Sequence, residues 1–194
     1  MGDVSQNINY ETGMNDWEDL QKEIFESQRL RFHILAKSYR NTIEISKYAG
    51  KILERASFGK YKIQPVIRHG KEVAFYKTEK PEQKTATIIE EIQKRGYDTT
   101  AVICRNEKEA EEVRQQLKIL LGVEGEEEEF KKGVMVLPIQ LTKGLEFDAV
   151  ILWNPNEKAY EENEGDAKLL YVAVTRALHE LHIVYKSNLS KLFQ

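Results

Sequence analysis

Short, uninterrupted apolar runs alternate along the chain with longer segments whose apolar residues recur every three or four positions. The runs fall at residues 32–35, 101–104, 134–137, 150–153 and 181–185. Continuous apolar runs of this length are typical of strands that are buried on both faces of a parallel sheet. The stretch 72–78 alternates more strictly between apolar and polar residues, which predicts an edge strand.

Helical patterns lie between these strands, at about residues 42–56, 81–95, 106–121 and 166–178. Asn41 or Thr42 is suited to cap the first, Pro81 opens the second and Asn106 opens the third. Gly96 and Gly122 follow the second and third at their ends. Strands that alternate with helices of this length predict an α/β fold with a mainly parallel sheet and helices on both faces.

The composition limits the classes of protein and the cellular compartments that are compatible with this fold. Hydrophobic residues make up 41% and charged residues 31% of the 194 positions, as in an ordinary globular protein. No apolar run approaches the roughly 18 residues of a membrane span, and the first residues lack the pattern of a signal peptide. The single cysteine, Cys104, excludes an internal disulfide framework and a cysteine-rich zinc module. We therefore predict a cytoplasmic protein without a membrane association or a metal site.

Charge is unevenly distributed along the chain. The net charge is −3, yet residues 29–68 carry ten basic and two acidic side chains, which leaves −11 for the remainder. A basic segment in an acidic chain indicates a surface that faces phosphate groups. The simpler alternative is a solvated, lysine-rich helix face.

Two arginines stand at positions where an anion would explain them. Arg40 lies in a predicted strand-to-helix loop, at the carboxyl end of a strand, where ligands of open α/β sheets bind. Arg176 lies in an apolar helical stretch, where a guanidinium is costly to bury unless it meets an anion. The alternative for Arg176 is a structural ion pair with Asp148 or Glu180.

A third segment adds the remaining groups of a nucleotide site. Lys143 is followed by Gly144, which allows close approach of the backbone to a phosphate, and then by Glu146, whose carboxylate could hold a sugar hydroxyl. Two arginines, a lysine and a carboxylate that converge on one edge of a sheet would form such a site.

Four segments together resemble a known family. They are GDVSQ (residues 2–6), SYRNT (38–42), TKGLEFDAV (142–150) and LLYVAVTRA (169–177). In order and character they resemble motifs III, IV, V and VI of the UvrD/Rep/PcrA-type superfamily 1 DNA helicases. The surrounding residues look most like the HelD branch, which associates with RNA polymerase. The resemblance implies a RecA-like domain of the P-loop NTPase type.

The resemblance also implies roles for individual residues. Those implied to act on the γ-phosphate of ATP are Gln6, Arg40 and Arg176. The resemblance implies that six residues bind the nucleotide: Tyr39, Arg40, Lys143, Gly144, Glu146 and Arg176. Of these, Tyr39 is implied to stack on the adenine and Glu146 to contact the ribose. Those implied to contact nucleic acid are Gln140 and Thr142.

The same resemblance divides the chain into two parts. Residues 1–28 correspond to the tail of a first motor domain and a linker, and residues 29–194 to the second RecA-like motor domain. The stretch between Arg40 and Lys143 is filled by the predicted sheet and helices, so no large accessory domain is inserted there. No G-x-x-x-x-G-K-[ST] phosphate loop is present, so we expect ATP and its Mg²⁺ to be held jointly with the first motor domain. Alone, this chain is expected to be inactive.

Three functions are compatible with these observations. The first is the carboxyl-terminal motor domain of an ATP-dependent DNA helicase or translocase, with the first motor domain and single-stranded DNA as partners. The second is a HelD-like factor that uses ATP to remodel RNA polymerase with little unwinding. The third is a binding module without ATP chemistry. Pro138 and Gln140 stand where the helicase family commonly has threonine and histidine, a departure that affects DNA tracking more than nucleotide binding.

Overall fold

A five-stranded, all-parallel sheet forms the centre of the molecule. The structure, a computed structural model, describes residues 37–38, 40–55, 64–65, 68–122 and 133–193. The order of the strands in the sheet is β3-β7-β6-β4-β5. Their bounds are β3 Ala74–Lys77, β4 Thr100–Cys104, β5 Val134–Pro138, β6 Phe147–Trp153 and β7 Ala177–Tyr185. Two further strands of two residues each, β1 (Lys37–Ser38) and β2 (Gln64–Pro65), pair in parallel apart from this sheet.

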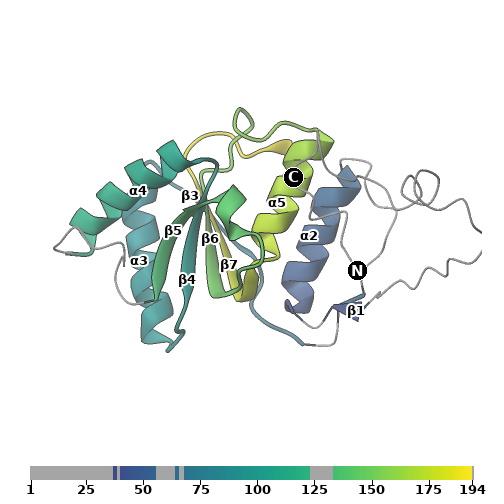
Figure 1. The fold of residues 1–194 in the computed structure, drawn as a ribbon, viewed down its shortest axis with the longest axis horizontal. Coiled ribbons are helices and arrows are strands. Elements are labelled where there is room, and N and C mark those ends of the chain that lie inside the picture. Colours follow the sequence, from purple (N-terminus) through teal and green to yellow (C-terminus); the bar gives the residue numbers. More distant parts are fainter. Residues whose placement is uncertain (1–36, 39, 56–63, 66–67, 123–132, 194) are drawn as a thin grey trace, which may run out of the picture.

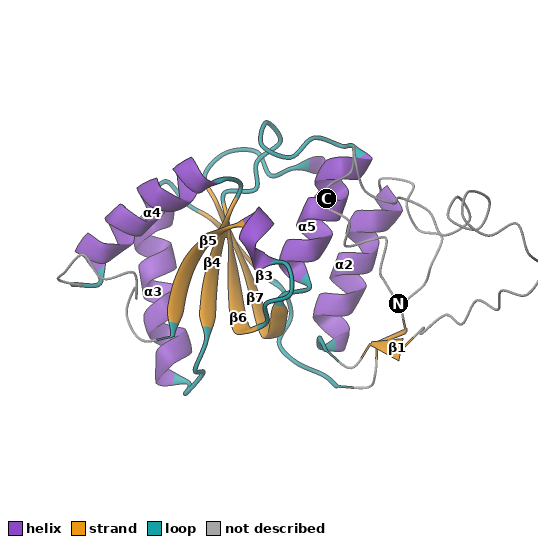
Figure 2. Cartoon of the chain, in the orientation of Figure 1, coloured by secondary structure: helices purple, strands orange, loops and turns teal. Residues whose placement is uncertain are grey.

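Helices cover both faces of the sheet. They are α2 Ile43–Arg55, α3 Pro81–Lys94, α4 Glu107–Leu120 and α5 Glu164–Val174, with short 3₁₀ helices η2 Ile139–Thr142 and η3 Lys191–Phe193. Figures 1 and 2 show α3 and α4 on one side of the sheet and α2 and α5 on the other. The predicted α/β architecture is confirmed.

The residues of β4 explain why the strands read as continuous apolar runs. Ala101 and Ile103 belong to the core beneath α2 and α5, whereas Val102 and Cys104 belong to the core beneath α3 and α4. All four are fully buried. Because successive side chains of a strand point to opposite faces, a sheet covered on both sides requires apolar residues at every position.

Local signals fix several helix ends as the sequence predicts. The side chain of Asn106 accepts a hydrogen bond of 2.9 Å from the backbone N–H of Glu109 at the start of α4. Pro81 occupies the first turn of α3, where its missing N–H costs nothing. The predicted edge strand is β3, which stands at the end of the sheet and pairs with β7 from Ala74 opposite His182.

Three boundaries differ from the prediction. The helix expected over residues 166–178 ends at Val174, because β7 already begins at Ala177. Strands β6 and β7 start at Phe147 and Ala177, three and four residues before the apolar runs that predicted them. Their early segments carry polar residues that the surrounding structure binds, so apolarity alone does not reveal them. The strand expected at residues 32–35 lies outside the described residues.

Candidate functional site

Arg176 lies in the turn that joins α5 to β7. It was expected within the helix, but α5 ends at Val174 and the turn follows. The side chain is buried, with 1% of its surface exposed. Its Nε donates to the carbonyl of Val172 at 3.0 Å, and its Nη1 donates to the carbonyl of Leu145 at 3.2 Å. The guanidinium therefore ties the end of α5 to the loop that precedes β6.

Arg40 and Glu146 meet beside this turn. The Nε of Arg40 lies 2.5 Å from Oε1 of Glu146, and the two side chains are 36% and 42% exposed. Glu146 directly follows Leu145, whose carbonyl accepts the hydrogen bond from Arg176. Three segments far apart in the sequence thus bring Arg40, Glu146 and Arg176 together, as the predicted site requires.

The position of this cluster in the fold differs from the expectation. Arg40 was expected at the carboxyl ends of the strands, in the crevice where α/β proteins commonly bind ligands. Glu146 and Arg176 instead immediately precede β6 and β7, so the cluster lies at the amino ends of these two strands. Arg40 follows β1, which belongs to the separate two-stranded pair and not to the central sheet. The crevice rule therefore does not apply to it.

Lys143 and Gly144 form the centre of a tight turn next to the cluster. The N–H of Leu145 donates to the carbonyl of Thr142 at 3.1 Å. Lys143 has φ −62° and ψ 125°, and Gly144 has φ 84°, the pattern of a type II turn. A Cβ on Gly144 would meet nothing within 4 Å, so the glycine is required by its backbone angle and not by a close neighbour. The side chain of Lys143 is exposed at the tip of this turn.

Gln140 and Thr142, the predicted nucleic-acid contacts, have different surroundings. Gln140 is exposed, and its Nε2 donates to the carbonyl of Arg105 at 3.4 Å, just beyond the carboxyl end of β4. Thr142 is fully buried, and its hydroxyl donates to the carbonyl of Ile139 at 2.7 Å. The side chain of Gln140 is accessible to a binding partner, whereas the buried side chain of Thr142 stabilises η2 through its hydrogen bond to Ile139.

The remaining predicted residues, Gln6 and Tyr39, lie outside the described residues, as does the whole segment 1–28. Sequence reasoning also missed two residues that hold the cluster together, Asn41 and Arg68. One guanidinium nitrogen of Arg68 donates to the carbonyls of Arg40 at 2.7 Å and of Leu178 at 2.6 Å. Their partners are backbone carbonyls distant in sequence, which leave no pattern for sequence analysis to detect.

The two carboxylates considered as structural partners for Arg176 are bound in other places. Oδ2 of Asp148 accepts hydrogen bonds from the backbone N–H groups of Asp98 and Thr99 at 3.0 and 2.9 Å. Glu180 is 1% exposed, and its oxygens lie 2.8 Å from Nζ of Lys71 and 2.8 Å from Nη2 of Arg95.

Glu180 also lies 3.1 Å from Nε2 of His182. Burial alone would raise the pKa of Glu180, but the hydrogen bonds from Lys71 and His182 and the charge of Arg95 outweigh it and lower the pKa below 4.5. Burial lowers the pKa of His182, although the neighbouring Glu180 acts in the opposite direction. This group forms a charge network on the α3 face of the sheet.

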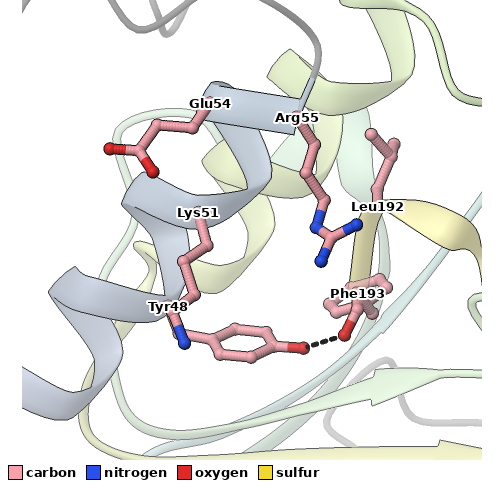
Figure 3. Close-up of a pocket in the computed structure, with 6 residues that line it drawn as sticks. All are labelled: Tyr48, Lys51, Glu54, Arg55, Leu192 and Phe193. Atoms are coloured by element: carbon pink, nitrogen blue, oxygen red, sulfur yellow. Dashed lines mark hydrogen bonds between the residues drawn. The ribbon is translucent and has the colours of Figure 1, made fainter.

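A hollow lies at the opposite end of α2 from Arg40. Its lining, drawn in Figure 3, comes from α2 and η3 and consists of Tyr48, Lys51, Glu54, Arg55, Leu192 and Phe193. The hydroxyl of Tyr48 donates to the carbonyl of Phe193 at 3.0 Å. The volume, about 490 Å³, is within the range of small-molecule sites. None of the predicted site residues contributes to it.

Two features are absent from the described part of the chain. It contains no group of three or more side chains suited to hold a metal ion. None of its helices combines the length and the apolar character needed to cross a membrane.

Comparison with known proteins identifies the fold and the family of this chain. The sequence profile of the UvrD-like helicase C-terminal domain matches residues 133–184, the part that carries the type II turn, α5 and Arg176. The crystal structure of the C-terminal domain of a possible DNA helicase from Lactobacillus plantarum WCFS1 is 32% identical in sequence. The alignment covers 80% of this chain and 92% of that one, with a TM-score of 0.64.

Other comparisons add less. The structure of PRRSV helicase is 15% identical, with coverage of 78% of this chain and 23% of that chain and a TM-score of 0.40, a likeness too weak to support an argument. No curated protein sequence matches significantly. The HelD branch is not distinguished by any of these likenesses. On the evidence of the Lactobacillus domain and the matching profile, the chain belongs to the UvrD-like helicase C-terminal domain family.

Proposed function

We propose that this chain is the second RecA-like motor domain of an ATP-dependent DNA helicase or translocase. In this proposal Arg40 and Arg176 supply positive charge to the γ-phosphate of ATP, which is bound against a first motor domain. The observation that carries the proposal is the meeting of Arg40, Glu146 and Arg176 at the amino ends of β6 and β7. Phosphoryl transfer depends mainly on positioning and charge neutralisation, and inserted arginines contribute about 10³–10⁵ to its rate.

Arg40 and Glu146 have the groups that a nucleotide needs. A guanidinium can donate two parallel hydrogen bonds to a phosphate, and a carboxylate can accept one from a ribose hydroxyl. Here they bind each other, and both remain more than a third exposed. An exposed ion pair contributes only about 0.2–1 kcal/mol, so exchanging it for a nucleotide costs little.

Arg176 and Lys143 complete the proposed set. The guanidinium of Arg176 lies against the carbonyl of Leu145, which places a fixed positive charge beside the loop that carries Glu146. Direct contact with a phosphate would require this side chain to turn outward. Lys143 is exposed at the neighbouring turn and adds a second cation. Tyr39 and Gln6 retain their proposed roles at the adenine and the γ-phosphate.

The nucleic-acid part of the proposal rests on the other end of the sheet. Gln140 is exposed next to the carboxyl end of β4 and is suited to contact single-stranded DNA, while Thr142 fixes the 3₁₀ turn that presents it. Residues 139–146 join this end directly to Glu146. The proposed DNA contacts and three of the proposed nucleotide contacts, Lys143, Gly144 and Glu146, therefore belong to one short segment.

The test compares ATP hydrolysis by this chain and by the full-length helicase. We expect no turnover from this chain alone, because the proposal assigns the phosphate loop and the Mg²⁺ ligands to the first motor domain. In the full-length protein, Arg40→Ala should reduce kcat/KM for ATP by at least about 10²-fold. Arg55→Ala, at the far end of α2, the helix that follows Arg40, is the matched control and should leave kcat/KM unchanged. Turnover by this chain in proportion to its concentration, or an active Arg40→Ala variant, would refute the proposal.

ATP-driven remodelling of RNA polymerase is the second function that the sequence suggested. The family assignment applies equally to it and to a helicase, and no described contact favours it. Strand unwinding by the full-length protein separates the two, whereas DNA-stimulated ATP hydrolysis alone does not.

A further inference from the structure

Asn41 lies between the two arginines of the proposed site. It directly follows Arg40 and is 5% exposed. Its side-chain Nδ2 donates to the carbonyl of Thr175 at 2.9 Å and to the carbonyl of Ala177 at 2.6 Å. These two carbonyls belong to the residues on either side of Arg176. One side-chain amide therefore holds both ends of the turn that carries Arg176.

The fold leaves both of these carbonyls in need of a donor. Thr175 caps the end of α5, where the last carbonyls of a helix have no intrahelical partner. Ala177 begins β7 well before β3 starts to pair with it at His182. A primary amide offers two N–H donors from one nitrogen and so satisfies both groups. Leaving either buried carbonyl without a partner would be destabilising, because the group would lose water without gaining a hydrogen bond.

Neighbouring hydrogen bonds extend the contact of Asn41 into a restraint on the side chain of Arg176. The N–H of Phe147 donates to the carbonyl of Arg176 at 3.0 Å, which fixes the backbone of the turn from the side of β6. The guanidinium then reaches Val172 and Leu145. With Asn41 on the other side, the backbone of Arg176 is held from two directions before its side chain extends.

We propose that Asn41 is a positioning residue that fixes Arg40 and Arg176 relative to each other for phosphoryl transfer. This inference rests on the proposed function. Asn41 touches no reacting group; it acts through the two carbonyls and through its covalent bond to Arg40. Displacement of a catalytic group by about 1 Å can lower a rate by about 10²-fold, so a clamp of this kind affects turnover more than nucleotide binding.

Two substitutions separate the clamp from simple packing. Asn41→Asp keeps the shape but replaces the donors with carboxylate oxygens that face two carbonyl oxygens, which is repulsive. Asn41→Ala removes the donors and leaves the carbonyls unpaired. In the full-length protein we expect kcat for ATP to fall by about 10- to 10²-fold in both, with KM changed less than about threefold. Asn41→Gln retains the amide and should recover part of kcat.

The matched control is Asn106→Ala. It also removes an asparagine side chain that binds backbone, but at the start of α4, on the opposite face of the sheet. We expect lower stability and unchanged kcat per folded molecule. A second readout uses this chain alone: the Nε–H resonance of Arg176, bonded to Val172, should shift and exchange faster in Asn41→Ala and not in Asn106→Ala.

Measurement of Arg176→Ala in parallel distinguishes failure of the positioning role of Asn41 from failure of the proposed function. If Arg176→Ala abolishes turnover while the Asn41 variants keep wild-type kcat and an unchanged Arg176 resonance, the positioning role is overturned and the proposed function stands. If Arg176→Ala itself keeps wild-type kcat, both are overturned. A fall in kcat for the Asn41 variants together with a shifted resonance supports the positioning role.

Discussion

Two arginine–carboxylate pairs lie at opposite ends of the sheet and have opposite surroundings. Arg105 and Asp166, just beyond β4 and in the first turn of α5, are joined at 2.8 Å, and their side chains are 28% and 12% exposed. Arg40 and Glu146, at the amino ends of β6 and β7, are joined at 2.5 Å but are 36% and 42% exposed. Both pairs join an arginine to a carboxylate, but the Arg105–Asp166 pair is less exposed to solvent than the Arg40–Glu146 pair.

The difference extends to the other bonds of each pair. The Nε of Arg105 also donates to the carbonyl of Ala159 at 2.9 Å, and Asp166 accepts from the N–H of Glu161 at 2.9 Å. The carboxylate of Asp166 thus organises the loop before α5. A partly buried pair with several shared bonds is costly to break, whereas an exposed pair is readily exchanged. The enclosure of Arg105–Asp166 indicates a structural role, whereas Arg40–Glu146 is exposed enough to exchange its partner for a ligand, as the proposed function requires.

The largest expected effect separates function from structure at Arg176. Arg176→Ala in the full-length protein should lower kcat for ATP by about 10²-fold or more, with a smaller change in KM, because in the proposed function its guanidinium would stabilise charge that develops during phosphoryl transfer. Its bonds to Val172 and Leu145 also predict a lower melting temperature for this chain. A lower melting temperature with normal kcat per folded molecule would mean that Arg176 is purely structural.

Asp166→Ala should be the most destabilising substitution among the ion pairs. It removes the partner of Arg105 and the acceptor for the backbone N–H of Glu161, so we expect the free energy of unfolding to fall by about 3 kcal/mol. Urea denaturation of this chain measures the change. ATP turnover per folded full-length molecule should remain close to wild type, and a loss as large as that of Arg176→Ala would contradict a structural role.

Glu180 extends the comparison to a carboxylate that is almost fully enclosed. Because its pKa is lowered in the folded protein, its contribution to stability is complete above pH 4.5 and is lost as the pH falls through the lowered value. Glu180→Gln should therefore reduce the free energy of unfolding at pH 7, by an amount on the order of 1 kcal/mol. The loss of stability on acidification below pH 4.5 should be less steep than in wild type. Identical acid profiles for the two proteins would show that the carboxylate does not titrate with folding.

The smallest effect is expected at the pair that faces the proposed nucleotide site. Glu146→Gln should change the free energy of unfolding by no more than about 0.5 kcal/mol, and high salt should remove even this difference. Denaturation at low and high salt concentration provides the measurement. A loss comparable to that of Asp166→Ala would show that the two pairs have the same structural role.

The fold could be predicted because its signals are local. The apolar run around β4, the cap at Asn106 and the proline that opens α3 each act within a few residues. The beginning of β7 could not be predicted in this way, since Glu180 is polar and yet buried. Its partners, Lys71 and Arg95, are distant in sequence and show no periodic pattern.

The site could be predicted in part. The resemblance of the motifs singled out Arg40, Glu146 and Arg176, and the structure brings them together. The resemblance did not indicate that the buried side chain of Arg176 donates hydrogen bonds to backbone carbonyls. Nor did it indicate that Asn41 binds the turn that contains Arg176. Hydrogen bonds to backbone carbonyls depend on the path of the chain and not on the identity of the partner residue, so they leave no trace in the sequence.

The segment that joins β5 to β6 has almost no slack. Pro138, the last residue of β5, pairs with Cys104 of β4, whereas Ala149 of β6 pairs with Thr100, four residues earlier in β4. Since β6 starts two residues before Ala149, its first residue lies about six residues, or about 20 Å, from the end of β5 along the strand direction. It also lies two strands away across the sheet. The direct distance is therefore about 22 Å. The 3₁₀ helix, the tight turn from Thr142 to Leu145, whose ends lie within about 7 Å of each other, and the extended residues on either side together reach about 24 Å.

A deletion of one residue between Ile139 and Glu146 would remove that margin, since one residue spans about 2 Å or more, and would pull β6 out of register with β4. Side chains in this segment can vary where they are exposed, as at Leu141 and Leu145. The number of residues cannot vary in the same way, because it is set by the height of the sheet that the segment crosses.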